Sequence, residues 1–350
     1  MVRTRAVGLA AFGAAALGGA VLGYLGERRV MAGQVQAPVA PGDDPAAGVG
    51  RARDVMSHDR TLLHVVEAGP PGAPTIVFVH GMGLSSAVWY HQVEALSDRY
   101  HTVAVDQRGH GESARAARGD YSLEALGGDV AAVVEAVARD APVLLVGHSI
   151  GAMAVLSCCE QHRDLVGQRV GGVVFCNTAA GGVLGGAVGS GVLAALGTVQ
   201  ARLHGALVSR SRRARERLEG SDAADRPTTD LSLLVTRQFG LTAHAPPDVV
   251  AFLEEQLRAT APVVLGSYAT ALAGLDLLDA ADAVTVPSLV IAGARDRLTP
   301  PRQAQRLVDA LPDAEMVAVE DAGHTAMLEA PEEVSATIGA FADRVFPRPR

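Results

Sequence analysis

A serine, an aspartate and a histidine, each placed shortly after an apolar run, could together form a nucleophilic site. Ser149 lies in GHSIG, residues 147–151, directly after VLLV. Asp296 follows SLVIAG, and His324 follows AEMVAV. A serine hydroxyl is a poor nucleophile at its own pKa, and an imidazole oriented by a third group can activate it. These residue types predict Ser149 as nucleophile, His324 as base and Asp296 as the acid that orients the base.

The residues around Ser149 fit the pattern G-x-S-x-G, which is informative where a strand ends and a helix begins. The apolar run before it predicts a strand, and the residues after it predict a helix. Gly147 and Gly151 let the two backbones approach closely around a tight, strained turn. We expect this turn to hold the hydroxyl at the carboxyl edge of a sheet, facing the unpaired N–H groups and positive dipole end of the helix.

Other imidazoles and acids compete for the same roles. His148 is the middle residue of the turn, and we expect its side chain to point away from that of Ser149. His110, in DQRGHGES, is expected in a structural turn. Asn177 follows another apolar run and occupies the other loop from which an acid could come. Three further carboxylates come at the end of a long insertion and not after a strand: Asp276, Asp279 and Asp282.

A loop that could stabilise a developing oxyanion follows the apolar run TIVFV. Its sequence is VHGMG, residues 79–83. The glycines leave the Met82 amide free to point into the site, and the Ile150 amide, next after the nucleophile, would supply the second donor. Because both donors are backbone N–H groups, the side chains at these two positions matter little for this role. The residues expected to support the motif are His80, Gly81 and Gly83.

The elements that must position these residues alternate between strands and helices, with apolar runs typical of strands covered on both faces. The expected strands cover residues 61–69, 75–81, 101–109, 142–149, 170–177, 287–293 and 314–321. The expected helices include residues 87–99, 122–138, 151–165, 301–311 and 331–345. The pattern predicts an α/β fold with a doubly wound, mostly parallel sheet. Open parallel sheets place their active sites at the carboxyl edge, where the candidate residues would meet.

One interval interrupts the alternation. Residues 179–285 have helical patterning over a length too great for an ordinary connection, which predicts an inserted helical cap. The core then consists of residues 56–178 and 286–350. The cap begins with an apolar, glycine-rich stretch, which favours a hydrophobic acyl or alcohol group in the substrate.

The N-terminal segment, residues 1–30, is expected to be a membrane anchor. Residues 6–26 carry no charge, and a helix of that length spans about 30 Å of hydrocarbon. A cleaved secretory signal is the alternative, but charged residues at 27–29 suit an interface better than a cleavage region. Arginines on both flanks nearly balance, so the orientation in the membrane stays open. Residues 31–55, rich in Pro, Gly and Ala, are expected to be a flexible linker.

Composition argues against other classes of protein. The 49% hydrophobic content over 350 residues can fill a large core, and the formal charge of −8 argues against a nucleic-acid-binding surface. The sequence has no H-E-x-x-H, no Cys/His ligand cluster and no Walker-type loop. We therefore expect neither a metal nor a cofactor. The expected partners are a small-molecule substrate and, through the N-terminal segment, a membrane.

Five motifs, in their order and spacing, resemble the α/β-hydrolase fold superfamily over roughly residues 60–346: HGMG, DQRGHGES, GHSIG, VIAGARDRLTP and DAGHTAMLEAP. The resemblance implies an acyl-enzyme mechanism in which Ser149 attacks an ester, thioester or amide carbonyl. The family's epoxide hydrolases and haloalkane dehalogenases place aspartate at the turn, and the serine argues against both. The N-terminal 55 residues and the arginine-rich part of the cap lie outside the family pattern.

These observations favour a serine hydrolase of the carboxylesterase or lipase type, acting on a lipophilic ester and held at a membrane. A cofactor-free haloperoxidase or perhydrolase, an acyltransferase and a carbon–carbon bond hydrolase could use the same three residues. A non-catalytic, membrane-tethered ligand-binding module on the same fold is the alternative from another class.

Overall fold

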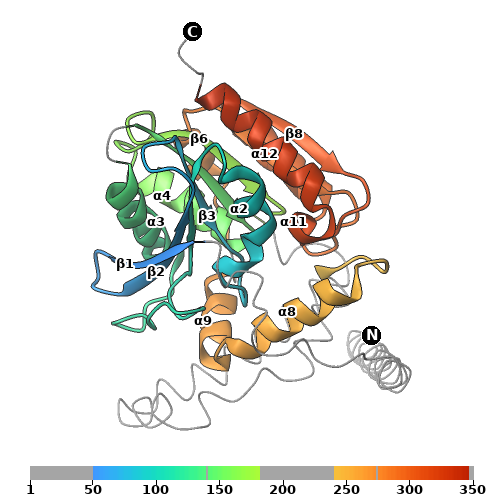
Figure 1. The fold of residues 1–350 in the computed structure, drawn as a ribbon, viewed down its shortest axis with the longest axis horizontal. Helices are drawn as coiled ribbons and strands as arrows, with labels where there is room; N and C mark the ends of the chain where they lie inside the picture. Colours follow the sequence, from blue (N-terminus) through green and yellow to red (C-terminus); the bar gives the residue numbers. More distant parts are fainter. Residues whose placement is uncertain (1–49, 139–140, 182–239, 273–274, 347–350) are drawn as a thin grey trace, which may run out of the picture. The chain divides into compact units, whose positions relative to one another are not determined.

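The computed structural model describes residues 50–138, 141–181, 240–272 and 275–346 (Figure 1). All of these belong to the second of two compact units, which begins at Gly48. The predicted anchor and the predicted N-terminal helix lie outside the described residues. Within the described ranges, no helix combines the length and the apolar character that crossing a bilayer requires.

The described strands form one eight-stranded sheet with the order β1-β2-β4-β3-β5-β6-β7-β8. The strands are β1 (Arg51–Met56), β2 (Leu62–Ala68), β3 (Thr75–Val79), β4 (His101–Val105), β5 (Val143–His148), β6 (Val170–Cys176), β7 (Ser288–Gly293) and β8 (Ala314–Val319). In this order, β2 pairs antiparallel with both β1 and β4, and every neighbouring pair from β4 onward is parallel. Parallel strands end at one edge of the sheet, so the loops after β3, β5, β7 and β8 share that edge.

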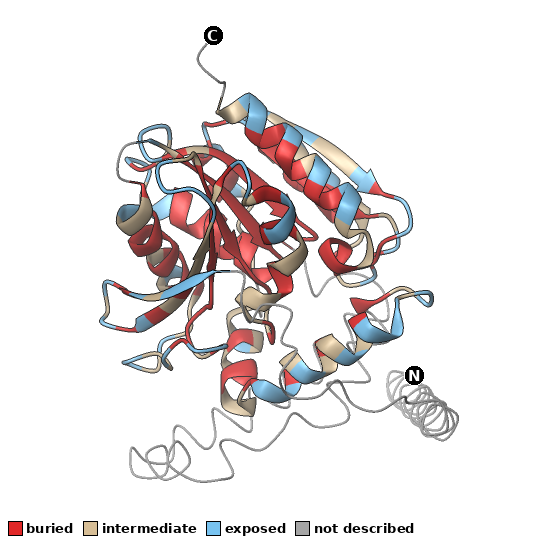
Figure 2. Ribbon diagram, in the orientation of Figure 1, coloured by how far each residue is buried: buried red, intermediate tan, exposed pale blue. Residues whose placement is uncertain are grey.

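Helices cover both faces of the sheet (Figure 1). One face packs against α3 (Leu123–Val137), α4 (Ile150–Gln161) and α10 (Pro301–Ala310). The other packs against α2 (Tyr90–Leu96), the short α11 (Ala326–Glu329) and α12 (Pro331–Val345). The central strands are buried along their whole length (Figure 2). This double coverage explains why their sequences are apolar runs without polar alternation.

The side chains of β5 show how one apolar run serves two cores. Val143 and Leu145 belong to the hydrophobic cluster under α3 and α4, while Leu144 and Val146 belong to the cluster under α2 and α12. Successive side chains of a strand point to opposite faces, so every position of the run is buried. The strand is therefore fixed between two cores at the point where the turn containing Ser149 begins.

Local signals explain where several helices start. Ser122 precedes α3, and its hydroxyl accepts a hydrogen bond from the Ala125 N–H at 3.2 Å. Pro301 and Pro331 occupy the first positions of α10 and α12, where the missing N–H leaves no hydrogen bond unmade. The helix expected over residues 87–99 begins as a 3-10 turn, η1 (Ser86–Trp89), and continues as α2.

The structure confirms all seven expected strands with shorter ends and adds one that the sequence did not predict. Residues 51–55, which we assigned to the linker, are part of β1, so that boundary is wrong. Three of the six residues in the strand RARDVM are charged, and only Val55 is buried. It pairs on one side only, at the sheet edge, and needs no apolar run.

The described part of the predicted cap is helical. It contains α8 (Pro247–Ala259) and α9 (Pro262–Leu272), followed by the 3-10 turn η3 (Asp279–Ala283). Residues 182–239 lie outside the described residues. The extent of the cap, 179–285, therefore stays a prediction.

Candidate active site

Ser149 sits in a strained turn between β5 and α4. Its backbone angles, φ 53° and ψ −122°, lie in a region that non-glycine residues rarely adopt. The Ser149 N–H donates to the Cys176 carbonyl at 3.0 Å, and its carbonyl accepts from the Thr178 hydroxyl at 2.8 Å. These hydrogen bonds to the end of β6 hold the turn in a conformation it would not adopt alone.

The two glycines of the motif are required by close backbone contacts. A Cβ on Gly147 would lie 2.4 Å from the Ala152 Cα. A Cβ on Gly151 would lie 2.3 Å from the His80 carbonyl oxygen and 2.5 Å from that of Val79. The first glycine lets α4 turn back over β5, and the second lets α4 touch the end of β3. The positions predicted from the sequence to permit close approach are therefore where the backbones meet.

The structure brings Ser149, Asp296 and His324 together at the carboxyl edge of the sheet. The Nε2 atom of His324 lies 3.0 Å from the Ser149 Oγ, and its Nδ1 atom lies 2.8 Å from the Asp296 Oδ2. The three loops follow β5, β7 and β8. The aspartate and the histidine are both buried. The arrangement is the one expected from the sequence, while the catalytic roles stay predictions.

Asp296 is held by more donors than His324 alone. Its Oδ1 accepts from the Leu298 and Thr299 N–H groups at 2.8 and 2.9 Å. Its Oδ2 accepts from the Thr299 hydroxyl at 2.7 Å and the Asn177 amide at 3.1 Å. Burial alone would raise the pKa of Asp296, but its interaction with His324 and the hydrogen bonds from His324 and Thr299 hold that pKa below its ordinary value. The carboxylate is therefore ionised near neutral pH.

Sequence reasoning missed the part played by Thr299. A hydroxyl three residues after an aspartate is a common local capping pattern, and this signal was available. Asn177, which we considered as another position for the acid, acts as a donor to Asp296 and to the Gly323 carbonyl. Its φ of 46° places it in the left-handed region. The competing carboxylates near η3 do not contact His324 in the described structure.

The loop after β3 lies against Ser149. A Cβ on Gly81 would be 3.2 Å from the Ser149 Cβ. The Gly81 carbonyl accepts from the His80 Nδ1–H at 2.7 Å, and in a trans peptide the following Met82 N–H points the opposite way. Ile150 supplies the first N–H of α4, which has no acceptor within its helix. These two amides are the donors that the sequence predicts for an oxyanion.

Three buried histidines near the site are neutral. Burial lowers the pKa of His80 to about 4 and the pKa values of His110 and His148 to about 3. The His148 Nε2–H donates to the His324 carbonyl at 2.8 Å, so this ring supports the backbone of the candidate base. His110 lies in a turn, as expected, and accepts from the Gly83 N–H at 3.0 Å. Among the four, His324 alone joins a carboxylate to the Ser149 hydroxyl.

The cap helices rest on the loop after β3. A Cβ on Gly83, whose φ is 74°, would lie 2.6 Å from Leu257 of α8 and 3.3 Å from Leu265 of α9. The Ser85 hydroxyl donates to the Gln256 side chain at 2.6 Å.

Within the described ranges, no three His, Cys, Asp or Glu side chains gather so as to hold a metal ion.

Fold and site geometry define a protein of the α/β-hydrolase class. The model of the alpha/beta hydrolase fold family matches residues 74–331, and the chain belongs to this family. This confirms both the resemblance and the predicted fold class.

Individual relatives cover different shares of the chain. Epoxide hydrolase A of Mycobacterium tuberculosis is 41% identical over 106 residues, 30% of this chain and 33% of that protein. A 2-(acetamidomethylene)succinate hydrolase of Mesorhizobium japonicum is 39% identical over 107 residues, 31% of this chain and 37% of that protein. The chain thus spans about a third of the length of these curated relatives. The enol-lactonase of Burkholderia xenovorans LB400 is 26% identical with a TM-score of 0.61, covering 83% of this chain and 99% of its own.

Proposed function

We propose that this protein is a serine hydrolase that cleaves carboxylic esters through an acyl-enzyme. The observation that carries the proposal is one imidazole placed between a hydroxyl and an ionised carboxylate, at 3.0 Å and 2.8 Å. With its Nδ1–H donated to Asp296, His324 presents an unprotonated Nε2 to the Ser149 Oγ–H. This is the tautomer that a general base requires.

The reaction follows from these positions. Ser149 Oγ bonds to the ester carbonyl carbon as its proton passes to His324 Nε2, and the carbonyl oxygen takes the negative charge facing the Met82 and Ile150 amides. The bond from the carbonyl carbon to the alkoxy oxygen then breaks, and His324 returns the proton to the leaving alcohol. Water attacks the acyl-enzyme with His324 as base, which releases the acid and restores the serine. Asp296 orients the imidazole and stabilises its charged form.

The serine at position 149 favours ester hydrolysis over epoxide hydrolysis, the reaction named for one relative. The Mycobacterium tuberculosis relative is called an epoxide hydrolase. The family resemblance places an aspartate at the turn of such enzymes, whereas this chain has Ser149 there. A serine forms an ester with an acyl group, which a histidine-activated water can hydrolyse, and acyl transfer is therefore the chemistry we propose.

We also propose an apolar group in the substrate and attachment to a membrane. Leu257 and Leu265 of the cap lie against Gly83, next to the proposed oxyanion donor, which supports an apolar surface near the reacting carbonyl. The uncharged stretch at residues 6–26 supports the anchor. Extraction of membranes with alkaline carbonate tests it: an anchored protein stays in the pellet, and release into the supernatant would contradict it.

Fluorophosphonate labelling of the full chain tests the nucleophile. We expect labelling of the wild type, none of Ser149→Ala, and unchanged labelling of Ser267→Ala, whose hydroxyl donates to a carbonyl of its own helix. A series of p-nitrophenyl esters from acetate to palmitate then measures chain-length preference. Absence of both labelling and turnover in the wild type would refute the serine hydrolase and favour a ligand-binding module.

A further inference from the structure

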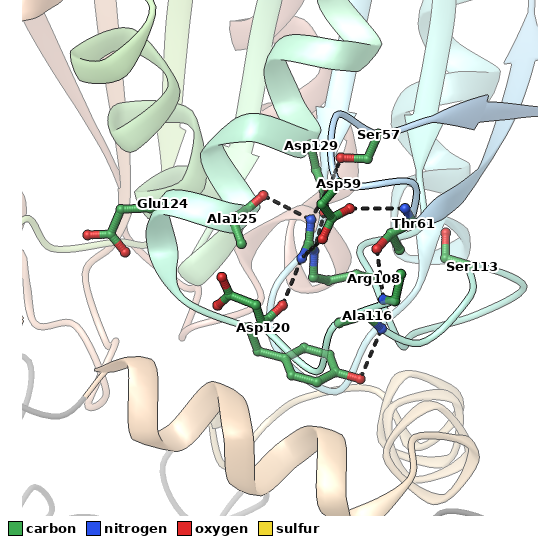
Figure 3. Close-up of polar contacts among 12 residues, drawn as sticks. Ser57, Asp59, Thr61, Arg108, Ser113, Ala116, Asp120, Glu124, Ala125 and Asp129 are labelled. Atoms are coloured by element: carbon green, nitrogen blue, oxygen red, sulfur yellow. Dashed lines mark hydrogen bonds and ion pairs between the residues drawn. The ribbon is translucent and has the colours of Figure 1, made fainter.

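The side chain of Arg108 is the centre of a buried polar network between the sheet and α3 (Figure 3). It donates five hydrogen bonds, one for each N–H of the guanidinium. Two go to the Asp129 carboxylate at 2.6 Å each and one to Asp59 at 3.0 Å. The others go to the carbonyls of Asp120 at 2.7 Å and Ala125 at 3.2 Å. A side chain with every donor used cannot rotate without breaking several charged contacts, so the backbone of Arg108 is fixed.

The carbonyl of Arg108 is a meeting point for two other elements. It accepts from the hydroxyl of Tyr268, on the cap helix α9, at 3.1 Å. It also accepts from the His110 Nδ1–H at 3.3 Å. The rings of His110 and Tyr268 pack edge to face with centroids 4.7 Å apart. Tyr268 is fully buried, so cap helix and turn share one packed contact.

The other nitrogen of His110 reaches the proposed oxyanion loop. Because a carbonyl can only accept, Nδ1 carries the proton and Nε2 is free to accept the Gly83 N–H at 3.0 Å. On the other side of Met82, the Gly81 carbonyl is held by the His80 Nδ1–H. Both peptide groups flanking Met82 are therefore fixed by buried, neutral imidazoles. The orientation of the Met82 N–H depends on both.

We propose that His110 and Tyr268 are positioning residues, which couple the cap helix α9 to the oxyanion loop through the carbonyl of Arg108. This inference rests on the proposed function for the role of the Met82 amide. Tyr268 holds the Arg108 carbonyl and the His110 ring from the cap side, and His110 in turn holds the Gly83 N–H. Displacement of α9 would loosen His110 and with it the peptide that follows Met82.

The structural link is tested without any substrate. Hydrogen–deuterium exchange of the peptide containing residues 80–84 is compared in the full-length wild type, Tyr268→Phe and Tyr121→Phe. Tyr121 is a matched control, because its ring lies 5.8 Å from that of Tyr268 and its hydroxyl accepts from the Ala116 N–H, outside the link. We expect exchange at Gly83 to be several-fold faster in Tyr268→Phe and unchanged in Tyr121→Phe. Equal exchange in the two variants would overturn the link.

The positioning role of His110 is tested with two variants that differ in whether they offer an acceptor to the Gly83 N–H. His110→Leu removes it, whereas His110→Gln can place an amide oxygen near the position of Nε2. We expect the kcat for ester hydrolysis to fall about tenfold in the leucine variant with KM little changed, less than the ~10²–10³-fold cost of losing an oxyanion donor outright. Recovery of most of the kcat in the glutamine variant would support positioning. An unchanged kcat in the leucine variant, or a loss confined to KM, would overturn it.

The two proposals fail in different ways. If wild-type Ser149 is neither labelled nor active while exchange at Gly83 still accelerates in Tyr268→Phe, the serine hydrolase fails and the link between α9 and the loop stands. If the wild type hydrolyses esters while Tyr268→Phe matches it in both exchange and kcat, the hydrolase stands and the link fails. Should His110→Leu not fold, Tyr268→Phe keeps the test, because it removes one hydroxyl and leaves the ring in place.

Discussion

Replacing Gly151 by alanine would force apart the start of α4, which follows Ser149, and the end of β3. The added Cβ would lie 2.3 Å from the His80 carbonyl oxygen and 2.5 Å from that of Val79, well inside the 3.0 Å below which real Cβ atoms are essentially never found. Both obstacles are backbone atoms, which cannot rotate away. The first turn of α4 must therefore move away from the end of β3 by several tenths of an ångström. This displacement carries the Ile150 amide and Ser149 with it.

The expected effects on stability and activity can be estimated separately. Overpacking of this kind costs about 1–3 kcal/mol in the free energy of unfolding. Misplacement of reacting groups by about 1 Å can cost ~10²-fold in rate, so we expect kcat for ester hydrolysis to fall by about 10–100-fold. Gly128→Ala is the control. Gly128 lies inside α3 with nothing within 4 Å of an added Cβ, and the change should stabilise the protein by about 0.5–1 kcal/mol.

The assay combines urea unfolding with ester hydrolysis. Trp89 is the one tryptophan of the chain and is fully buried, so its fluorescence reports unfolding. We expect the two alanine variants to shift the unfolding midpoint in opposite directions and Gly128→Ala to keep wild-type kcat. If Gly151→Ala had wild-type stability and a kcat within about twofold of the wild-type value, the displaced turn would neither destabilise the fold nor slow the reaction, and that result would refute the prediction.

Two further predictions concern buried charges. Asp296→Asn should lower kcat by about 10⁴-fold, because the imidazole loses the partner that fixes its tautomer, measured with a p-nitrophenyl ester. The pKa of Asp296 is lowered in the folded protein, so its ionised form stabilises the fold. This stabilisation is complete above about pH 4, the pKa of an unfolded aspartate, and is lost as the pH falls through the lower pKa of the folded protein. The asparagine variant should therefore lose less stability over that range. Arg108→Leu should cost about 3–5 kcal/mol in urea unfolding, because the Asp129 carboxylate stays buried without its partner. Burial already raises the pKa of Asp129, so this deficit should shrink as pH falls and the carboxyl takes up a proton; a deficit independent of pH would contradict the assignment.

The parallel core of the sheet could be predicted from the sequence because its strands are covered on both faces. A strand such as β3, TIVFV, is buried at every position and is therefore a continuous apolar run. The edge strand β1 could not be predicted in this way, since it buries one side chain and its sequence matches that of a polar linker. What fixes β1 is its pairing with β2, a long-range fact that no local pattern records.

The three candidate catalytic residues could be predicted because they require only the order of elements. Ser149, Asp296 and His324 each follow a strand of one parallel sheet, and the ends of such strands share an edge. The groups around them depend on side-chain direction, which spacing does not give. Thr299, three residues after Asp296, fits a local pattern, but Asn177 donates to the same carboxylate from a different loop, and no local pattern indicates this.

The buried histidines show why residue type alone does not identify a catalytic group. His80, His110 and His148 all lie in glycine-containing turns near the site, and so does His324. The first three pair one nitrogen with a backbone carbonyl and have pKa values lowered to about 3 or 4, so they stay neutral and act as fixed hydrogen-bonding groups. His324 instead faces an ionised carboxylate on one nitrogen and a hydroxyl on the other. Its position between these two groups is the geometry that the proposed base requires, whereas the other rings hold the backbone around it.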